Sequence, residues 1–166
     1  MRPIKKVLVP TDFSGYSLSA MDYALSIAAV YEAKVYLMNV VDNIPTGAFH
    51  TIDLDAEAVR RNAQERAVEE LKKFVSEKLE GREDLVQVVR CGNPAEEIAA
   101  FARDEHVDLI VMATHGRTGL AHMLMGSVAE RVVRESNVPV LTVKPDEFQW
   151  NPLKESDVRE QLHLRF

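Results

Sequence analysis

The strongest constraint on the fold is a repeated alternation between short apolar runs and helical patterns. Five runs are rich in β-branched and aliphatic residues, and most are apolar throughout, as expected for parallel strands that are covered on both faces. Right-handed crossovers through the intervening helices predict an α/β fold, an open, doubly wound five-stranded parallel sheet of Rossmann-like type. The runs are residues 6–10, 34–41, 85–90, 108–114 and 138–143.

The segments between these runs carry helical signals. A long stripe at four-residue spacing marks the second helix, whose other face is charged. Asn93 and Pro94 specify the start of the third helix, where Asn caps, Pro fits the first turn and Glu96 can reach back. The fourth helix begins at Gly126-Ser127. The stripe consists of Val59, Ala63, Ala67, Leu71, Val75 and Leu79.

Composition and charge exclude several classes of protein. The chain has 166 residues, of which 46% are hydrophobic and 28% charged, which is typical of one soluble domain. Its net charge of −6 argues against nucleic acid as a partner. Cys91 is the only cysteine, so no internal disulfide can form. The apolar run 7–9 is too short for a signal peptide and no run is long enough to span a membrane, so we expect a cytoplasmic protein without membrane contact.

The expected topology places a ligand site before any motif is considered. In open α/β sheets, ligands bind beyond the carboxyl ends of the strands, where the strand order reverses. With the order 3-2-1-4-5, that point lies between strands one and four. Pro10, Thr11 and Asp12 should therefore face Thr114-His115-Gly116.

The segment 113–127 has the chemistry of a phosphate cradle. Gly116, Gly119 and Gly126 allow positive φ and close backbone approach. The helix that starts at Gly126-Ser127 offers free N–H groups and a dipole to an anion, and Arg117 adds a cation. The segment has neither a Walker lysine nor a G-x-G-x-x-G turn.

Two alternative roles compete with phosphate binding at this segment. Ser127 with Glu130 also fits a helix capping box, so spacing alone does not decide for phosphate. Asp12, His115 and Ser127 could form a hydrolase triad, but the sequence has no G-x-S-x-G elbow. The histidines lack metal-ligand spacing, and we predict neither a metal site nor catalytic residues.

The chain resembles the universal stress proteins of the UspA superfamily over residues 4–144. Nucleotide-binding members carry G-x-x-G, nine residues, and then G-S or G-T; here Ala113 to Gly116 is followed by nine residues and Gly126-Ser127. The Val-Pro-Thr-Asp of strand one, Gly-Asn-Pro-Ala-Glu-Glu-Ile and the final Val-Pro-Val-Leu-Thr-Val also match. The departure is Ala113, which replaces the first motif glycine.

The resemblance implies a role for individual residues. Thr11 and Asp12 would line the adenosine end, and Val40 would meet the adenine through its backbone. Met112 and Ala113 would close the pocket. The ligand would be ATP, with or without Mg²⁺. The phosphates would be held by Gly116, Gly126, Ser127 and Val128.

The remaining expectations concern loops, tail and assembly. We expect a universal stress protein domain over residues 1–144 and a tail, 145–166, that is either a docking arm or disordered. The last strand, 138–143, would be an exposed apolar edge, and pairing with its twin gives a homodimer, as the resemblance also suggests. The loop 42–53 could serve as a flap.

The leading functional hypothesis is a nucleotide-responsive regulatory dimer in which ATP orders the loops at 42–53 and 115–126 and so alters binding of an unidentified protein partner. The alternatives are a dimeric stress-response scaffold that binds no nucleotide and a slow ATPase or hydrolase. Slow hydrolysis could act as a timer within the leading hypothesis.

Overall fold

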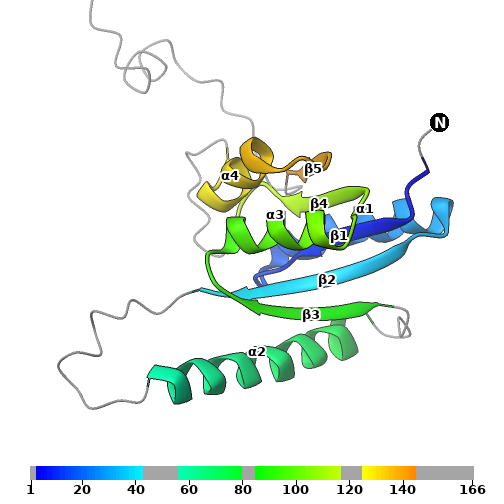
Figure 1. Ribbon diagram of the computed structural model, residues 1–166. Coiled ribbons are helices and arrows are strands. Elements are labelled where there is room, and N and C mark those ends of the chain that lie inside the picture. The colour runs from blue at the N-terminus through cyan, green and yellow to red at the C-terminus, as the bar shows by residue number, and fades with distance from the viewer. Residues whose placement is uncertain (1–2, 43–55, 80–84, 117–124, 145–166) are drawn as a thin grey trace, which may run out of the picture.

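The computed structural model describes residues 3–42, 56–79, 85–116 and 125–144. Strands and helices alternate along the chain (Figure 1). In chain order they are β1 (Lys6–Pro10), α1 (Gly15–Tyr31), β2 (Lys34–Val41), α2 (Ala56–Lys78), β3 (Val86–Cys91), α3 (Pro94–Asp104), β4 (Leu109–Ala113), α4 (Ser127–Glu135) and β5 (Val140–Val143).

All five strands belong to one parallel sheet in the order β3-β2-β1-β4-β5, which confirms the predicted fold class. The central strand β1 pairs with β2 from Lys6 to Pro10 and with β4 at Val7 and Leu8. The order reverses between β1 and β4, because the chain runs outward to β3 and then returns to β4 on the other side of β1. The predicted reversal point is therefore confirmed.

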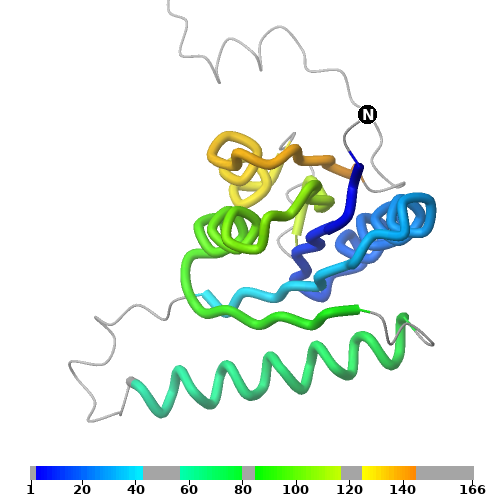
Figure 2. The backbone as a smooth tube through the Cα atoms, turned by 45° about the vertical axis from the view of Figure 1, so that its right-hand side comes forward, coloured from blue at the N-terminus to red at the C-terminus, as the bar shows by residue number. Residues whose placement is uncertain are grey.

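Side chains of β1 alternate between two apolar layers. Val7 and Val9 pack into one layer with α1 and α2, whereas Leu8 packs into the other with α3 and α4. All three side chains are fully buried. In Figure 2, α1 in blue and α3 in green lie on opposite sides of the strands. This two-sided burial explains why the strands are apolar without alternation.

The last strand is shorter than predicted. β5 begins at Val140, whereas the sequence predicted a strand from residue 138. Ser136 Oγ donates to the Val138 carbonyl at 3.1 Å and accepts from the Val138 N–H at 3.0 Å, so a local turn uses both backbone groups of Val138. Pro139 has no N–H for a ladder.

The long helix α2 buries part of the predicted stripe. Ala67 and Leu71 are buried, as is Leu79 directly after the helix, and Phe74, which the four-residue spacing missed, is buried as well. Because an α-helix has 3.6 residues per turn, positions spaced by four rotate gradually away from the buried face. Phe74, between two predicted positions, therefore points inward. None of the helices in the described ranges is both long and apolar enough to cross a membrane.

The start of α3 confirms the predicted N-cap. Asn93 Oδ1 accepts from the backbone N–H groups of Ala95 at 3.1 Å and Glu96 at 3.3 Å. The Glu96 carboxylate does not complete a capping box, because its Oε1 accepts from Arg131 of α4 at 2.6 Å. This ion pair ties α3 to α4.

Glu32, which ends α1, has φ of 54°, in the left-handed region that favours glycine. Glu32→Gly should therefore stabilise the fold, by about 0.5–1 kcal/mol. Urea unfolding followed by circular dichroism measures the change. The matched control is Glu65→Gly on the exposed face of α2, which should destabilise by about 1 kcal/mol. A loss of stability in Glu32→Gly would contradict the strain argument.

Candidate functional site

The turn after β1 is fixed by hydrogen bonds around Thr11. The Thr11 N–H donates to the Met38 carbonyl at 2.8 Å. Its Oγ1 lies 2.9 Å from Ser17 Oγ and accepts from the Phe13 N–H at 3.0 Å. Thr11 is buried, so its hydroxyl supports the turn from inside. Pro10, which precedes it, is the last residue of β1.

Phe13 makes this turn sharp. Its φ is 65°, an uncommon value for a residue with a side chain. The Phe13 ring packs against Phe74 of α2, with the ring centroids 5.6 Å apart. This contact holds the aromatic side chain while the backbone reverses. Asp12 and Ser14, on either side, are thereby directed to the carboxyl edge of the sheet.

Asp12 lies against the loop that follows β4. Its Oδ1 accepts from the Ser14 N–H at 3.1 Å and from Ser14 Oγ at 2.6 Å. A Cβ placed on Gly116 would lie 2.6 Å from Asp12 Oδ2. The two segments, about a hundred residues apart in the sequence, are therefore in close contact. The prediction that the turn after β1 faces the loop after β4 is confirmed.

Asn39 is a buried polar residue of this site that the sequence patterns did not predict. Its Nδ2 donates to the Thr11 carbonyl at 2.8 Å. The bond joins β2 to the turn after β1, beyond the last paired residues of the two strands, Pro10 and Met38. The available signal was an amide within an otherwise apolar strand, because such a group needs a partner when buried.

The backbone of Val40 faces the side on which β1 has ended. Along a strand, successive residues direct their N–H and C=O groups to opposite neighbours. The Met38 carbonyl accepts from Thr11 on the β1 side, and the Val41 carbonyl accepts from Gly92 on the β3 side. Val40 therefore directs its backbone groups toward the β1 side, where the predicted adenine contact requires them.

The N-terminus of α4 differs in one respect from the expected cradle. The Gly126 N–H donates to the Thr114 carbonyl at 2.7 Å, so it is occupied. The first bond within the helix runs from the Glu130 N–H to the Gly126 carbonyl at 2.9 Å. The N–H groups of Ser127, Val128 and Ala129 precede that bond. These three groups, and not that of Gly126, are the donors that α4 offers to an anion.

Ser127 is not the N-cap of α4. Gly126 occupies the cap position and Ser127 is the first helical residue, so the alternative capping box with Glu130 does not form. Ser127 and Val128 are both exposed. A hydroxyl in the first turn, beside three backbone donors, is suited to an anion.

The glycines act through close approach and not through positive φ. Gly126 has φ of −72°, and Gly92 is the one glycine of the described residues with positive φ. A Cβ on Gly126 would lie 3.2 Å from the Thr114 carbonyl oxygen. Of the two properties that the sequence allowed at Gly116 and Gly126, close approach is observed and positive φ is not. A side chain at either position would crowd Asp12 or the Thr114 carbonyl oxygen.

Ala113, the departure from the family motif, fits its position. It is the last residue of β4, pairs with Val143 and packs against the apolar layer under α1. It is not among the residues with positive φ. Its methyl group is therefore compatible with the backbone of this strand.

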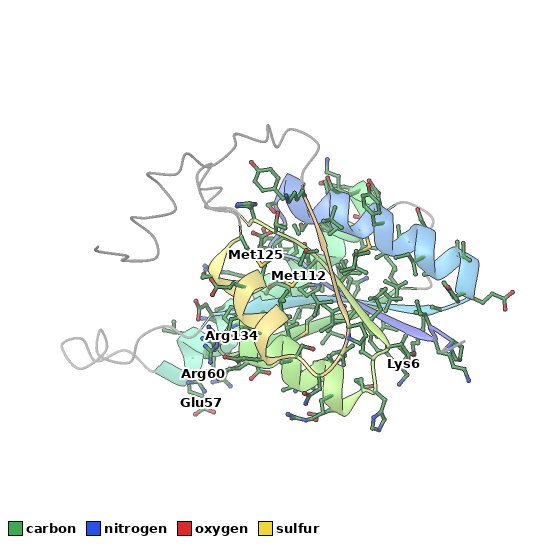
Figure 3. The ribbon with its side chains drawn as sticks, turned by 90° about the horizontal axis from the view of Figure 1, so that it is seen from above. Lys6, Glu57, Arg60, Met112, Met125 and Arg134 are labelled. Carbon is green, nitrogen blue, oxygen red and sulfur yellow. The ribbon has the colours of Figure 1, made fainter. Side chains whose placement is uncertain are left out.

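Met112 and Met125 lie on the opposite side of the sheet, toward α4 (Figure 3). Met112 is buried, and Met125 packs against the same apolar layer. Several predicted elements lie outside the described residues. They are Arg117, Gly119, the tail 145–166 and all of the loop 42–53 except Asp42.

His115 is held next to Thr114. Its Nδ1 lies 3.0 Å from Thr114 Oγ1, and Thr114 is buried. Within the described residues, no group of three or more His, Cys, Asp or Glu side chains is arranged to hold a metal ion. The Thr114 carbonyl accepts from the Gly126 N–H, and this bond holds the backbone after β4 in place.

Arg131 fixes α4 relative to α3. Its Nε donates to Glu135 Oε1 at 2.9 Å and its Nη2 to Glu96 Oε1 at 2.6 Å. The hydrogen bonds with Glu135 and with Glu96 raise the pKa of Arg131. Such exposed pairs add little stability, but a guanidinium that binds two carboxylates sets geometry. Arg131 lies one turn after Ser127 and so orients the anion-facing end of α4.

Removal of the Asn39 amide should destabilise the fold. Asn39→Ala leaves the buried Thr11 carbonyl without this donor, and we expect a loss of about 1–3 kcal/mol in the free energy of unfolding. Urea unfolding measures it. Asn137→Ala, at an exposed position, is the control and should change stability by less than about 0.5 kcal/mol. Equal effects of the two substitutions would refute the role assigned to Asn39.

Comparison with known proteins places this geometry in context. The sequence matches the Universal stress protein family over residues 3–144. It is 41% identical to universal stress protein MJ0531 of Methanocaldococcus jannaschii over 143 residues, covering 84% of this chain and 82% of that protein. It is 32% identical to MJ0577 of the same organism, over 84% and 94% of the two chains.

Solved structures of universal stress proteins have a similar fold. The structure of MJ0577 superposes with a TM-score of 0.75 at 31% identity, covering 88% of this chain and 99% of that one. A universal stress protein in complex with cAMP superposes with a TM-score of 0.56 at 30% identity, covering 86% and 98%. The family match spans the full set of described strands and helices.

Proposed function

This chain belongs to the universal stress protein family, and on that premise we propose that it binds ATP, alone or with Mg²⁺, at the carboxyl edge between β1 and β4 and acts as a nucleotide-responsive regulatory dimer in the cytoplasm. The proposal has three parts: a phosphate subsite, an adenosine subsite and a dimer edge. Each part has its own support.

The observation that carries the proposal is the set of donors at the first turn of α4. The N–H groups of Ser127, Val128 and Ala129 precede the first bond within the helix, and Ser127, whose hydroxyl lies beside them, is exposed. A helix N-terminus with free N–H groups favours negative charge. Gly126 supports this arrangement, because its bond to Thr114 anchors the helix start to the end of β4. A phosphate chain is the matching ligand.

The adenosine subsite is supported on the other side of the same edge. Asp12 is oriented by Ser14 and lies beside Gly116, so its carboxylate stands between the turn after β1 and the loop after β4. A carboxylate in this position can accept hydrogen bonds from ribose hydroxyls. The backbone of Val40 faces the same side of β2. The related structure in complex with cAMP supports an adenine nucleotide as the ligand class.

The regulatory part of the proposal follows from the number of segments that meet at the site. A nucleotide shifts a conformational equilibrium only through a difference in affinity between two states. The site joins segments that follow β1, β2 and β4, so ATP would favour the state in which these segments are close together. A protein partner that binds the two states with different affinity would then respond to whether ATP is bound. A Mg²⁺ ion, where present, would screen the charge of the phosphates.

We propose that the dimer forms through residues 138–143. β5 lies at the edge of the sheet, and Leu141 on it is 38% exposed. Val133 of α4 adds exposed apolar surface from the helix that packs beside β5. An exposed apolar edge strand is a template for pairing with another chain.

The nucleotide test starts with the purified protein. We expect adenine nucleotide to be released by acid and identified by chromatography, and ATP to bind in a calorimetric titration. Gly126→Val should weaken ATP binding at least about tenfold, or ~1.4 kcal/mol, because the side chain would press on the Thr114 carbonyl and displace the helix start.

The control for that substitution is Ala113→Gly, which restores the family motif. Because Ala113 does not adopt positive φ, the variant should bind ATP with an affinity similar to that of the original chain. The dimer should persist in both variants. Failure of the original chain to bind ATP at about 1 mM, which corresponds to less than ~4 kcal/mol of binding free energy, would favour the nucleotide-free scaffold instead.

The dimer is tested separately. Leu141→Arg places a charge on the proposed contact of β5, and we expect analytical ultracentrifugation to show a shift from dimer to monomer. The control is Gln87→Arg on β3, the edge strand at the other side of the sheet, which should leave the dimer intact. A dimer that survives Leu141→Arg and dissociates with Gln87→Arg would show that the interface lies at the β3 edge and contradict the proposal.

A further inference from the structure

The outer face of α1 carries large apolar side chains where a surface helix is normally charged. Asp22 is the one charged residue between Gly15 and Tyr31. Three of its large apolar side chains are exposed to solvent: Tyr23 by 55%, Val30 by 78% and Tyr31 by 43%. A helix that is apolar on both faces is usually covered on both. The inner face of α1 already packs into the layer over β1 and β4.

The outer apolar residues form one stripe along the helix. Tyr23 and Val30 are seven residues, or two turns, apart, and Tyr31 adds apolar surface at the end of the helix. Ile27, between them, packs against the inner layer. Residues two turns apart lie on the same helix face. The stripe from Tyr23 to Tyr31 is about 12 Å long at a rise of about 1.5 Å per residue. This outer stripe of α1 has the length of a helix-packing surface.

A segment of the same chain carries the complementary pattern. Beyond the family match, which ends at residue 144, the sequence continues for residues 145–166. Within them Val158, Leu162 and Phe166 recur every four residues and would cover about 12 Å of a helix. The residues between them are polar or charged, with the exception of Leu164. The intervening positions are Arg159, Glu160, Gln161, His163, Leu164 and Arg165.

The segment begins next to α1. Val143, the last residue of β5, is buried in the same apolar layer as Ala20, Met21 and Ala24 of α1, and the end of β5 lies beside the start of α1 in Figure 3. The α1 helix is about 25 Å long. Residues 145–157 can span up to about 40 Å. Residues 158–166 can therefore reach any part of the outer stripe.

We propose that residues 145–166 bind the outer stripe of α1 in the same chain, with Val158, Leu162 and Phe166 packed against Tyr23, Val30 and Tyr31. Attachment at Lys144 favours this occupant over a second copy, because a tethered segment has a high effective concentration at a nearby surface. The contact would be an addition to the family domain. It does not depend on nucleotide binding.

Disulfide trapping in the full chain tests the contact. Cys91 is the only cysteine, so Cys91→Ser provides a clean background. Leu162→Cys is combined with either Tyr23→Cys or Val30→Cys, all at exposed or tail positions that leave the core intact. The control combines Leu162→Cys with Arg103→Cys, an exposed position at the end of α3 across the sheet. A disulfide requires the two Cα atoms to approach within about 7 Å.

We expect at least one of the two α1 pairs to oxidise about tenfold faster than the control pair and to yield a monomer with an internal disulfide on a non-reducing gel. Equal rates for all pairs would overturn the proposal. Disulfide-linked dimers as the sole product would overturn it too, because a second copy would then supply the contact.

Hydrogen exchange gives an independent measurement without cysteines. Val30→Asp should increase deuterium uptake in peptides from residues 158–166, whereas Arg103→Asp should leave that uptake unchanged. Both positions are exposed, so both variants should retain the fold, which circular dichroism can verify. Identical uptake in 158–166 for the original chain and Val30→Asp would refute docking on α1.

Discussion

The architecture depends on the burial of β1 on both of its faces. Val7, Leu8 and Val9 are fully buried, and they alternate between the layer under α1 and α2 and the layer under α3 and α4. A strand that must be covered on both sides requires helices on both faces of the sheet, and parallel neighbours require crossovers to supply them. From the carboxyl end of β1 the chain continues to β2 and β3 on one side of β1, and it later returns to β4 on the other side. The candidate site lies at this end because of that topology.

A second constraint acts at the start of α4. The Gly126 N–H and the Thr114 carbonyl are joined at 2.7 Å, and a Cβ at Gly126 would lie only 3.2 Å from that oxygen. The bond sets where the helix begins, and so decides which N–H groups remain available to an anion. Arg131, one turn later, adds a lateral constraint through Glu96 of α3. The position of the proposed phosphate subsite is therefore fixed by a strand end and by a neighbouring helix.

The sequence predicted the strands, their order and the location of the site, because these depend on patterns that are local or follow from topology. Asn39 was missed, because its bond partner is the Thr11 carbonyl in the turn after β1, which is distant in the sequence. The glycines illustrate a different limit. Their presence was informative, but the reason for them is the proximity of Asp12 and Thr114, which no local pattern reveals. The shortened β5 similarly results from a side-chain bond that competes with the ladder.

The helix α1 connects the two surfaces for which we propose ligands. It starts at Gly15, directly after the turn that holds Asp12, and its outer stripe extends toward Tyr31. One helix therefore has a proposed nucleotide subsite at its beginning and a proposed docking surface along its side. Two ligands on one rigid element influence each other only if that element has two positions that they bind with different affinity. The Phe13–Phe74 contact and the buried inner face of α1 favour a single position. On this structure, the two proposed contacts act independently, and the tail is better understood as a cover for α1 than as a sensor of the nucleotide.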